Sequence, residues 1–314
     1  METLSSLLNS FRAVGVVLIL TACGYVFAAL GWIQPDAKRF LSKYLMRFAV
    51  PVMCVYSLRT NLTLELLKSS PRLLLVPTIA SAVLYVLTLL IGKALRLDPK
   101  QSSVFAVMGS VSNAMFIGYP MCLELFGETC VPYVMLFFFV NTAFSQLVGV
   151  NGIRRAGEQE GGSLREAVLG FLKTPSVLGV LVGFVLILVD WTPPQLVMSC
   201  ARYINNAVTP LALVMAGSII HEIGLKKLRL DKLLCLTMVL RFLVAPAICL
   251  ALCAVLGVTG LARSVIVVQA AMPVLTQAVV AAAEYGADER LAAQGVAIST
   301  LASFVVIPVL MLLL

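Results

Sequence analysis

Apolar segments of about 20 residues recur along the whole chain, and they constrain its fold more than any other feature. A helix of that length crosses the hydrocarbon of a bilayer, which is about 30 Å thick. Hydrophobic residues make up 61% of the sequence and charged residues 12%, against about half and about a quarter in soluble domains. We therefore expect an all-α polytopic membrane protein. Ten transmembrane helices are predicted, at residues 11–33, 41–58, 72–92, 102–126, 129–150, 168–190, 199–220, 233–256, 264–284 and 292–313.

The distribution of Lys and Arg predicts how these spans are oriented. Most basic residues flank the odd-numbered loops, while the termini and the even-numbered loops carry few. Because basic residues accumulate on the cytoplasmic side of a membrane, the odd loops are predicted to be cytoplasmic and both termini to lie outside. The basic residues next to odd loops are Lys38, Arg39, Lys43, Arg47, Lys93, Arg96, Lys100, Arg154, Arg155, Arg165, Lys173, Lys226, Lys227, Arg229, Lys232 and Arg290.

The chain contains an internal repeat. A polar stretch at residues 151–166, predicted to be a flexible cytoplasmic linker, separates residues 1–150 from residues 167–314, and each part holds five predicted spans. Shifting the second part by 159 residues aligns uncommon residues of both parts, including the only two tryptophans, so we infer a duplication. The aligned pairs are Gly24 and Gly183, Tyr25 and Phe184, Trp32 and Trp191, Pro35 and Pro194, Tyr44 and Tyr203, Pro51 and Pro210, and Phe126-Gly127 and Tyr285-Gly286.

An odd number of spans in each repeat means that the second copy enters the bilayer from the opposite side. This predicts an inverted five-plus-five repeat, the construction of many secondary transporters. A duplicated membrane protein with a structural or sensory role and no transport is the alternative.

The fourth and ninth spans, which the duplication makes equivalent, both carry signals for a break in mid-membrane. We expect Pro120 to free the carbonyl of Phe116, and Pro273 to free that of Gln269, because proline lacks an N–H and collides with the carbonyl four residues earlier. Two broken helices crossing at the midplane would direct half-helix N-termini at one cavity and attract a carboxylate. Simple kinks are the alternative. The candidate substrate-binding residues here are Asn113, Gly118 and Pro120 in the fourth span and Gln269, Pro273, Thr276 and Gln277 in the ninth.

Three further polar residues inside apolar spans are candidates for substrate binding. Asn141 and Gln146 lie in the fifth span, and Arg241 lies in the eighth. A charged residue inside a membrane often marks a functional site. Arg241 can either attract an anionic substrate or extend its side chain to the cytoplasmic interface, and the sequence leaves both roles open.

Several other functions find little support in the sequence. An intramembrane enzyme would need a nucleophile or a metal set, yet HExxH and GxSxG motifs are absent and the chain has one histidine. The eight cysteines lack metal-binding spacing and are expected to be buried apolar residues. The net charge of +8 is spread among short loops, which argues against nucleic acid as a partner. No cofactor is expected.

Four segments resemble the auxin efflux carrier family, which includes plant auxin exporters and bacterial dicarboxylate permeases. NAMFIGYPM (113–121) is similar to the family's Asn-x4-Gly-x-Pro stretch in the broken fourth helix, SIIHEIGL (218–225) to the end of the seventh, RFLVAP (241–246) to the eighth, and residues 271–308 to the ninth and tenth. The resemblance implies ten helices in an inverted repeat, with a scaffold and a transport bundle that move relative to each other. It also implies that helices 4 and 9 cross at their breaks and that substrate binds beside Asn113, Gly118, Pro120 and Pro273.

On this basis we expect a secondary transporter in a bacterial inner (plasma) membrane. It would carry a mono- or dicarboxylate, auxin-like or malate-like or malonate-like, by alternating access. A symporter or antiporter of related fold, similar to bile-acid symporters and coupled to a cation or proton, stays open as an alternative. A relay of carboxylates at the midplane is not expected, because none lies beside either predicted break. The sequence does not decide whether a proton or a sodium ion is a coupling partner. It also does not decide whether the protein forms a homodimer.

Overall fold

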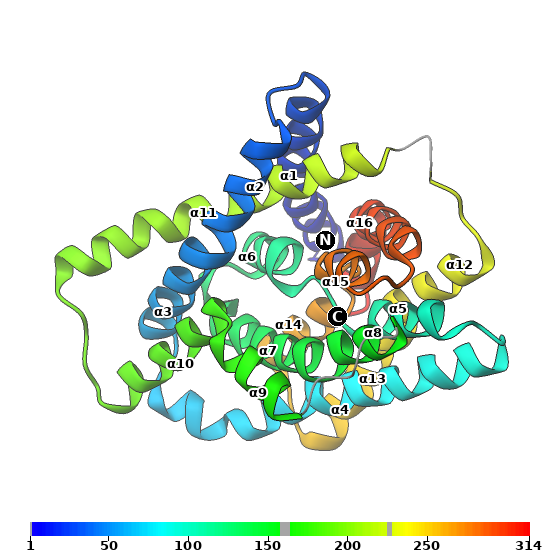
Figure 1. Cartoon of the computed structure of the whole chain (residues 1–314). Helices are drawn as coiled ribbons and strands as arrows, with labels where there is room; N and C mark the ends of the chain where they lie inside the picture. The colour runs from blue at the N-terminus through cyan, green and yellow to red at the C-terminus, as the bar shows by residue number, and fades with distance from the viewer. Residues whose placement is uncertain (1, 158–163, 225–227) are drawn as a thin grey trace.

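The computed structural model describes residues 2–157, 164–224 and 228–314, and its regular secondary structure there is helical (Figure 1). One isolated antiparallel β-bridge, between Ser112 and Val274, is the exception within these ranges. The elements are α1 (Glu2–Ala29), α2 (Pro35–Tyr44), η1 (Leu45–Ala49), α3 (Val50–Asn61), α4 (Leu64–Ala94), α5 (Pro99–Ser110), η2 (Ala114–Gly118), α6 (Tyr119–Phe126), η3 (Glu128–Cys130), α7 (Val131–Phe144), η4 (Ser145–Gly149), α8 (Val150–Ala156), α9 (Leu164–Lys173), α10 (Pro175–Leu188), α11 (Gln195–Ile223), α12 (Lys232–Val239), η6 (Leu240–Val244), α13 (Ala245–Leu256), α14 (Gly260–Ala270), α15 (Gln277–Glu284) and α16 (Glu289–Met311).

Polar caps fix where several of these helices begin. Thr63, Asp98, Asp231 and Asp288 each accept a hydrogen bond from the backbone N–H three residues later, at the starts of α4, α5, α12 and α16. Such caps satisfy one of the N–H groups that have no partner inside the helix.

The structure supports an integral membrane protein. Within the described ranges six segments are long and apolar enough to cross a bilayer, and the pair at 165–188, bent by 72°, makes a seventh if it forms one span. The predicted spans at 41–58, 102–126 and 264–284 are not among these segments. The first lies in a continuous helical stretch, residues 35–61, made of α2, η1 and α3, and the other two are interrupted by non-helical residues.

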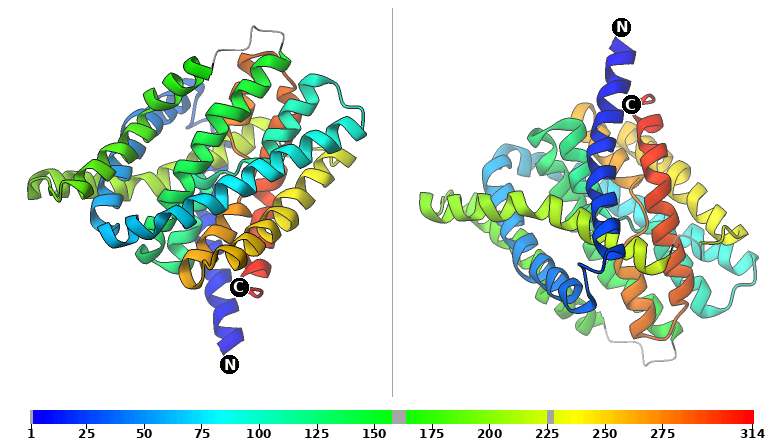
Figure 2. Two further views of the ribbon diagram at one scale, coloured as in Figure 1. Left: turned by 90° about the horizontal axis from the view of Figure 1, so that it is seen from below. Right: turned by 90° about the horizontal axis from the view of Figure 1, so that it is seen from above.

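Two groups of helices pack side by side. In one group α1 packs along α11, α10 packs along α3, and α11 also contacts α3; in the other, α4 packs along α5, α7 and α13, α13 packs along α14, and α15 packs along α16 (Figures 1 and 2). The groups meet where α1 contacts α6 and α16 and where α3 contacts α7. The beginning of α1 and the end of α16 lie at the same end of the molecule (Figure 2).

The stretch predicted as a flexible linker is helical at both of its ends. Helix α8 continues to Ala156, and α9 begins at Leu164. Residues 158–163 lie outside the described residues.

Three π turns end two residues before a proline. They are η1 before Pro51, η2 before Pro120 and η6 before Pro246. Each π turn runs directly into the following helix, and its wider turn accommodates the hydrogen bond that the proline cannot make. The expectation that Pro120 breaks the fourth span is therefore wrong, because the helix continues from Ala114 through Pro120 to Phe126 and the break lies at residues 111–113.

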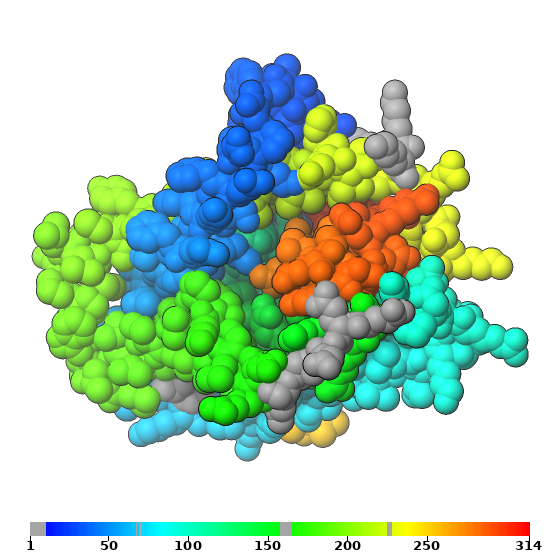
Figure 3. All heavy atoms as spheres, in the orientation of Figure 1, coloured from blue at the N-terminus to red at the C-terminus, as the bar shows by residue number. Residues whose placement is uncertain are grey.

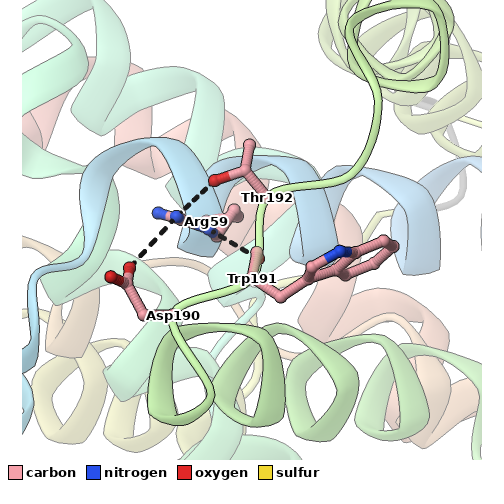
Figure 4. Close-up of polar contacts among 4 residues, drawn as sticks. All are labelled: Arg59, Asp190, Trp191 and Thr192. Atoms are coloured by element: carbon pink, nitrogen blue, oxygen red, sulfur yellow. Dashed lines mark hydrogen bonds and ion pairs between the residues drawn. The ribbon is translucent and has the colours of Figure 1, made fainter.

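Ion pairs connect the first part of the chain to the second at both ends of the bundle. Arg59, near the end of α3, donates Nε to the carbonyl of Trp191 at 3.0 Å, pairs with Asp190 at 3.5 Å and donates to the hydroxyl of Thr192 (Figure 4). At the opposite end, Lys38 of α2 pairs with Glu222 of α11. These contacts lie within the group that contains α1, α3, α10 and α11.

Candidate functional site: two interrupted helices and a cavity

Two non-helical segments meet in the middle of the molecule. Residues 111–113 separate α5 from η2, and residues 271–276 separate α14 from α15. The backbones pair through the Ser112–Val274 bridge, and the N–H of Asn113 donates to the carbonyl of Pro273 at 2.8 Å. We call this pair of segments the crossover. The two breaks lie in the spans that the sequence made equivalent.

Neighbouring helices satisfy the polar backbone groups of the crossover. Asn141 of α7 accepts from the N–H of Ser112 at 3.1 Å and donates Nδ2 to the carbonyl of Ser112 at 2.8 Å. The hydroxyl of Ser299, on α16, accepts from the N–H of Val274 at 2.9 Å. Sequence reasoning missed Ser112 and Ser299, although the repeat offset places Asn141 opposite Thr300, the neighbour of Ser299.

Asn113 links the two halves of the crossover through its side chain. Its Oδ1 accepts from the N–H of Phe116 at 3.2 Å and so caps the start of η2, while Nδ2 donates to the hydroxyl of Thr276 at 3.0 Å. Asn113 is 2% exposed. Loss of its amide would therefore uncap one half-helix and disconnect it from the start of α15.

A small cavity of about 40 Å³ lies against the crossover, and a larger one of about 630 Å³ adjoins it. The predicted residues Asn113, Asn141, Thr276 and Gln277 line the small cavity. Gln146 lines the large one. The surface is hollowed between α2, in blue, and α15, in orange (Figure 3). The cavities share the lining residues Met46, Phe116, Thr276 and Gln277, so the large cavity adjoins the small one at the crossover.

The charges near this site belong to the large cavity. Lys38, Glu222, Glu284 and Glu289 line it, and Lys38 and Glu222 form an ion pair. Burial lowers the pKa of the Lys38 ammonium, and the adjacent carboxylate opposes that change by favouring the charged form. Among the described residues that line the small cavity, none is charged.

A separate cavity of about 280 Å³ lies toward the opposite ends of α3 and α11. Its lining includes Ser57, Tyr119 and Asn205, and it shares no lining residue with the small cavity. The side-chain Oδ1 of Asn205 accepts from the Ser57 hydroxyl at 3.3 Å and from the Tyr119 hydroxyl at 3.5 Å. These contacts join α3, α6 and α11 on this side of the crossover.

Five of the predicted residues line neither the small nor the large cavity: Gly118, Pro120, Gln269, Pro273 and Arg241. Gln269 is 0% exposed and lies against Gly118, where a Cβ atom would collide with its side chain. The carbonyl of Gln269, expected to be free, accepts from the N–H of Met272 at 3.3 Å. Pro273 lies within the break and contributes its carbonyl to Asn113. The prediction of unpaired carbonyls that bind a guest is therefore wrong for Gln269.

Arg241 lies beneath the crossover and is 1% exposed. It donates to the carbonyls of Ala270 at 2.6 Å, Met272 at 2.9 Å and Gly109 at 3.3 Å. Of the two roles that the sequence left open, extension of the side chain to an interface does not occur, because the side chain is buried and bonds to these carbonyls. It does not line the small or the large cavity either.

The chemistry that the site offers is that of two helix N-termini. The starts of η2 and α15 both contribute to the small cavity, through Ala114 and Met115 on one side and Thr276 and Gln277 on the other. The first N–H groups of a helix lack intrahelical partners and carry a partial positive charge. Such an arrangement favours a small anion without the help of a basic side chain.

The comparison with known proteins covers almost the entire chain. A family model described as membrane transport protein matches residues 10–311. An uncharacterised transporter of Methanocaldococcus jannaschii is 23% identical over 300 residues, covering 93% of this chain and 94% of the relative. An uncharacterised transporter of Methanothermobacter thermautotrophicus is 24% identical over 305 residues, covering 96% and 97%.

Proposed function

The chain belongs to the membrane transport protein family, which is the auxin efflux carrier family that its motifs resemble, and from this premise we propose that it is a secondary transporter of a small organic anion. The observation that carries the proposal is the pair of half-helix N-termini that face the small cavity beside Asn113, Thr276 and Gln277. Each N-terminus is equivalent to about half a positive charge, so two together complement about one carboxylate.

The lining of the small cavity suits an anion with an apolar body. Met46, Val50, Phe116, Phe138 and Leu275 surround its polar groups. The amide and hydroxyl groups would then orient the carboxylate, while burial of apolar atoms contributes about 25 cal/mol per Å². Both mono- and dicarboxylates remain within this substrate class.

The cavities support an alternating-access mechanism. In the proposed cycle this conformation gives access to the crossover through the large cavity, whose lining includes Lys38 and Glu222. By the distribution of basic residues this is the cytoplasmic side, with both termini outside the plasma membrane. The cavity at the opposite end is separated from the crossover, and the contacts of Asn205 with Ser57 and Tyr119 would have to change for access from that side.

Ten spans in an inverted repeat remain our proposal for the architecture, and helix contacts support it. Gly24 of α1 packs against Gly217 of α11. By the offset of 159 residues, Gly24 corresponds to Gly183 in the second repeat and Gly217 corresponds to Leu58 in the first. Gly183 and Leu58 also contact each other, as expected when a pseudo-two-fold axis relates the two repeats.

Transport by reconstituted protein tests the proposed function. Proteoliposomes loaded with an unlabelled mono- or dicarboxylate should accumulate the same labelled compound by counterflow. Asn113→Ala should reduce this uptake by about tenfold or more, the effect of one lost hydrogen bond to a charged group. Asn151→Ala is the matched control, because its amide bonds only to the carbonyl of Leu147 in its own helical segment.

The outcomes separate the alternatives. Uptake that needs a sodium or proton gradient would indicate an ion-coupled transporter. Binding of a carboxylate without counterflow would indicate a sensor. Equal loss of folded protein in Asn113→Ala and Pro273→Ala, with no specific loss of transport, would reduce both residues to a structural role.

Labelling of introduced cysteines tests the orientation. In a variant without reactive native cysteines, Lys38→Cys should react with an impermeant maleimide only from the cytoplasmic side, and Glu128→Cys only from outside. Reaction of both from one side would contradict the proposed arrangement.

A further inference from the structure

The C-terminal ends of two half-helices converge on one side chain, that of Arg241. Its Nη2 donates to the carbonyls of Ala270 and Met272 at 2.6 and 2.9 Å, Nε donates to Met272 at 3.2 Å, and Nη1 donates to Gly109 at 3.3 Å. Ala270 is the last residue of α14, and Gly109 lies in the last turn of α5. The carbonyls of a last helical turn have no partner inside the helix.

The two converging helix ends favour a positive charge between them. Each helix C-terminus is equivalent to about half a negative charge, so the two ends together carry about one. The surroundings exclude water, since Arg241 is 1% and Ala270 is 5% exposed. Buried partial charges interact more strongly than charges in water. One guanidinium group carries one positive charge and five N–H donors, enough to neutralise the two helix ends and to bond to their carbonyls.

The partners of Arg241 are all backbone carbonyls. Each hydrogen bond that it makes in the described part of the chain ends on a carbonyl oxygen. Backbone carbonyls are also the groups that bind monovalent cations in selectivity filters, where they replace the hydration shell of the ion. The site therefore has the ligand chemistry of a monovalent cation site, with a side chain occupying it.

A small void extends this site. A space of about 10 Å³ lies next to Arg241 and is lined by the polar residues Ser81, Ser110 and Ser112 as well as by apolar ones. Removal of the guanidinium would enlarge this space to hold a cation of similar size together with water. Arg241 belongs to η6 and not to the crossover segments. A substitution of Arg241 therefore changes no residue of the crossover itself.

We propose that Arg241 is the built-in cation of the crossover and that it occupies a latent site for a monovalent cation. As a consequence the protein does not require bound sodium, and truncation of Arg241 makes both its stability and its transport dependent on a cation from solution. The effect on transport rests on the proposed function, whereas the effect on stability does not. Arg241 is a positioning residue, because it holds the carbonyl ends of α5 and α14 and does not line the small cavity.

The test uses the full chain with Arg241→Ala, and guanidinium, sodium, potassium and N-methyl-D-glucamine chlorides as probes at equal ionic strength. Unfolding temperature in detergent is measured first, and counterflow in proteoliposomes second. Wild-type values should be the same in all four salts. Arg241→Ala leaves three buried carbonyls without this partner, those of Gly109, Ala270 and Met272, so transport should fall by about tenfold or more. Guanidinium or sodium at millimolar concentration should restore both measurements at least in part.

Matched variants separate this role from simple packing. Arg47→Ala removes an exposed arginine from the comparable π turn η1 and should show no response to guanidinium or sodium. Arg241→Lys keeps the charge and should stay independent of the salt. Arg241→Met fills the space without a charge and should behave like Arg241→Ala.

Each further outcome decides the proposal. If Arg241→Ala folds only when it is purified in guanidinium, the proposal is supported. If Arg241→Met is as stable as Arg241→Lys in every salt, or if wild-type protein requires sodium, the proposal is refuted. If wild-type protein transports no carboxylate, the unfolding temperatures still test the cation site, and only the proposed function fails.

Discussion

Removal of the Asn141 side chain should destabilise the protein through the backbone of a single residue, Ser112. Asn141 accepts from the N–H and donates to the carbonyl of Ser112, at 3.1 and 2.8 Å. Both residues are buried, at 4% and 1% exposure. Asn141→Leu is close in volume and leaves both backbone groups without these partners. Each unsatisfied buried group costs about 1–3 kcal/mol, so the upper limit for the pair is about 6 kcal/mol.

Water from the adjacent cavity should reduce this cost. The cavity of about 40 Å³ that Asn141 lines exceeds the roughly 10–15 Å³ that one water molecule requires. A water molecule satisfies one of the two groups, so we expect a loss of about 1–3 kcal/mol. At about 2–4 °C per kcal/mol, the unfolding temperature should fall by roughly 2–12 °C.

Thermal unfolding in detergent, followed by tryptophan fluorescence, measures this loss. Ser145→Ala is the matched control one turn further along, because Ser145 is 2% exposed and its hydroxyl has no hydrogen-bond partner among the residues that the structure describes. Its removal should be neutral or slightly stabilising. An Asn141→Leu variant that unfolds within about 1 °C of Ser145→Ala would refute the assignment of Asn141 as the partner of the broken backbone.

Two other predictions concern close packing at glycines. Gly118→Ala should cost about 1–3 kcal/mol of unfolding free energy because the new methyl group meets the side chain of Gln269. Addition of Gln269→Ala should recover most of that loss, and additive losses in the double variant would refute the contact. Gly24→Ala should destabilise the protein because its Cβ meets the carbonyl of Val214. Gly15→Ala, in the same helix with open space around it, should stabilise by about 0.5–1 kcal/mol. Thermal unfolding that ranks these two variants in the opposite order would contradict the packing of α1 on α11.

The breaks of the fourth and ninth spans could be located from the sequence because they combine three local signals. A proline, a nearby amide and an equivalent position in the other repeat all point to residues near Asn113 and Pro273, and the structure interrupts both helices there. The prediction was less accurate for Pro120. A proline marks a missing N–H, but only the neighbouring backbone decides whether a break, a kink or a π turn absorbs it.

The partners of the crossover could not be predicted from the sequence. Asn141 and Ser112 are 29 residues apart, and Arg241 bonds to Gly109 across 132 residues. Local patterns carry no information about such pairs. The sequence identified Asn141 and Arg241 as polar residues that need partners, but only the packing of helices shows that these partners are backbone groups.

The bridge between Ser112 and Val274 limits how this protein can change shape. Two segments from different parts of the chain are joined by backbone hydrogen bonds, by the side chain of Asn113 and, from beneath, by Arg241. Sliding one interrupted helix past the other would break all of these contacts in a water-poor interior, so the two are expected to travel as a rigid body. In the proposed transport cycle the displacement would then take place at the borders of this body with α2, α3 and α11, where methionines such as Met46 and Met215 line the large cavity and adapt to a new position at low cost.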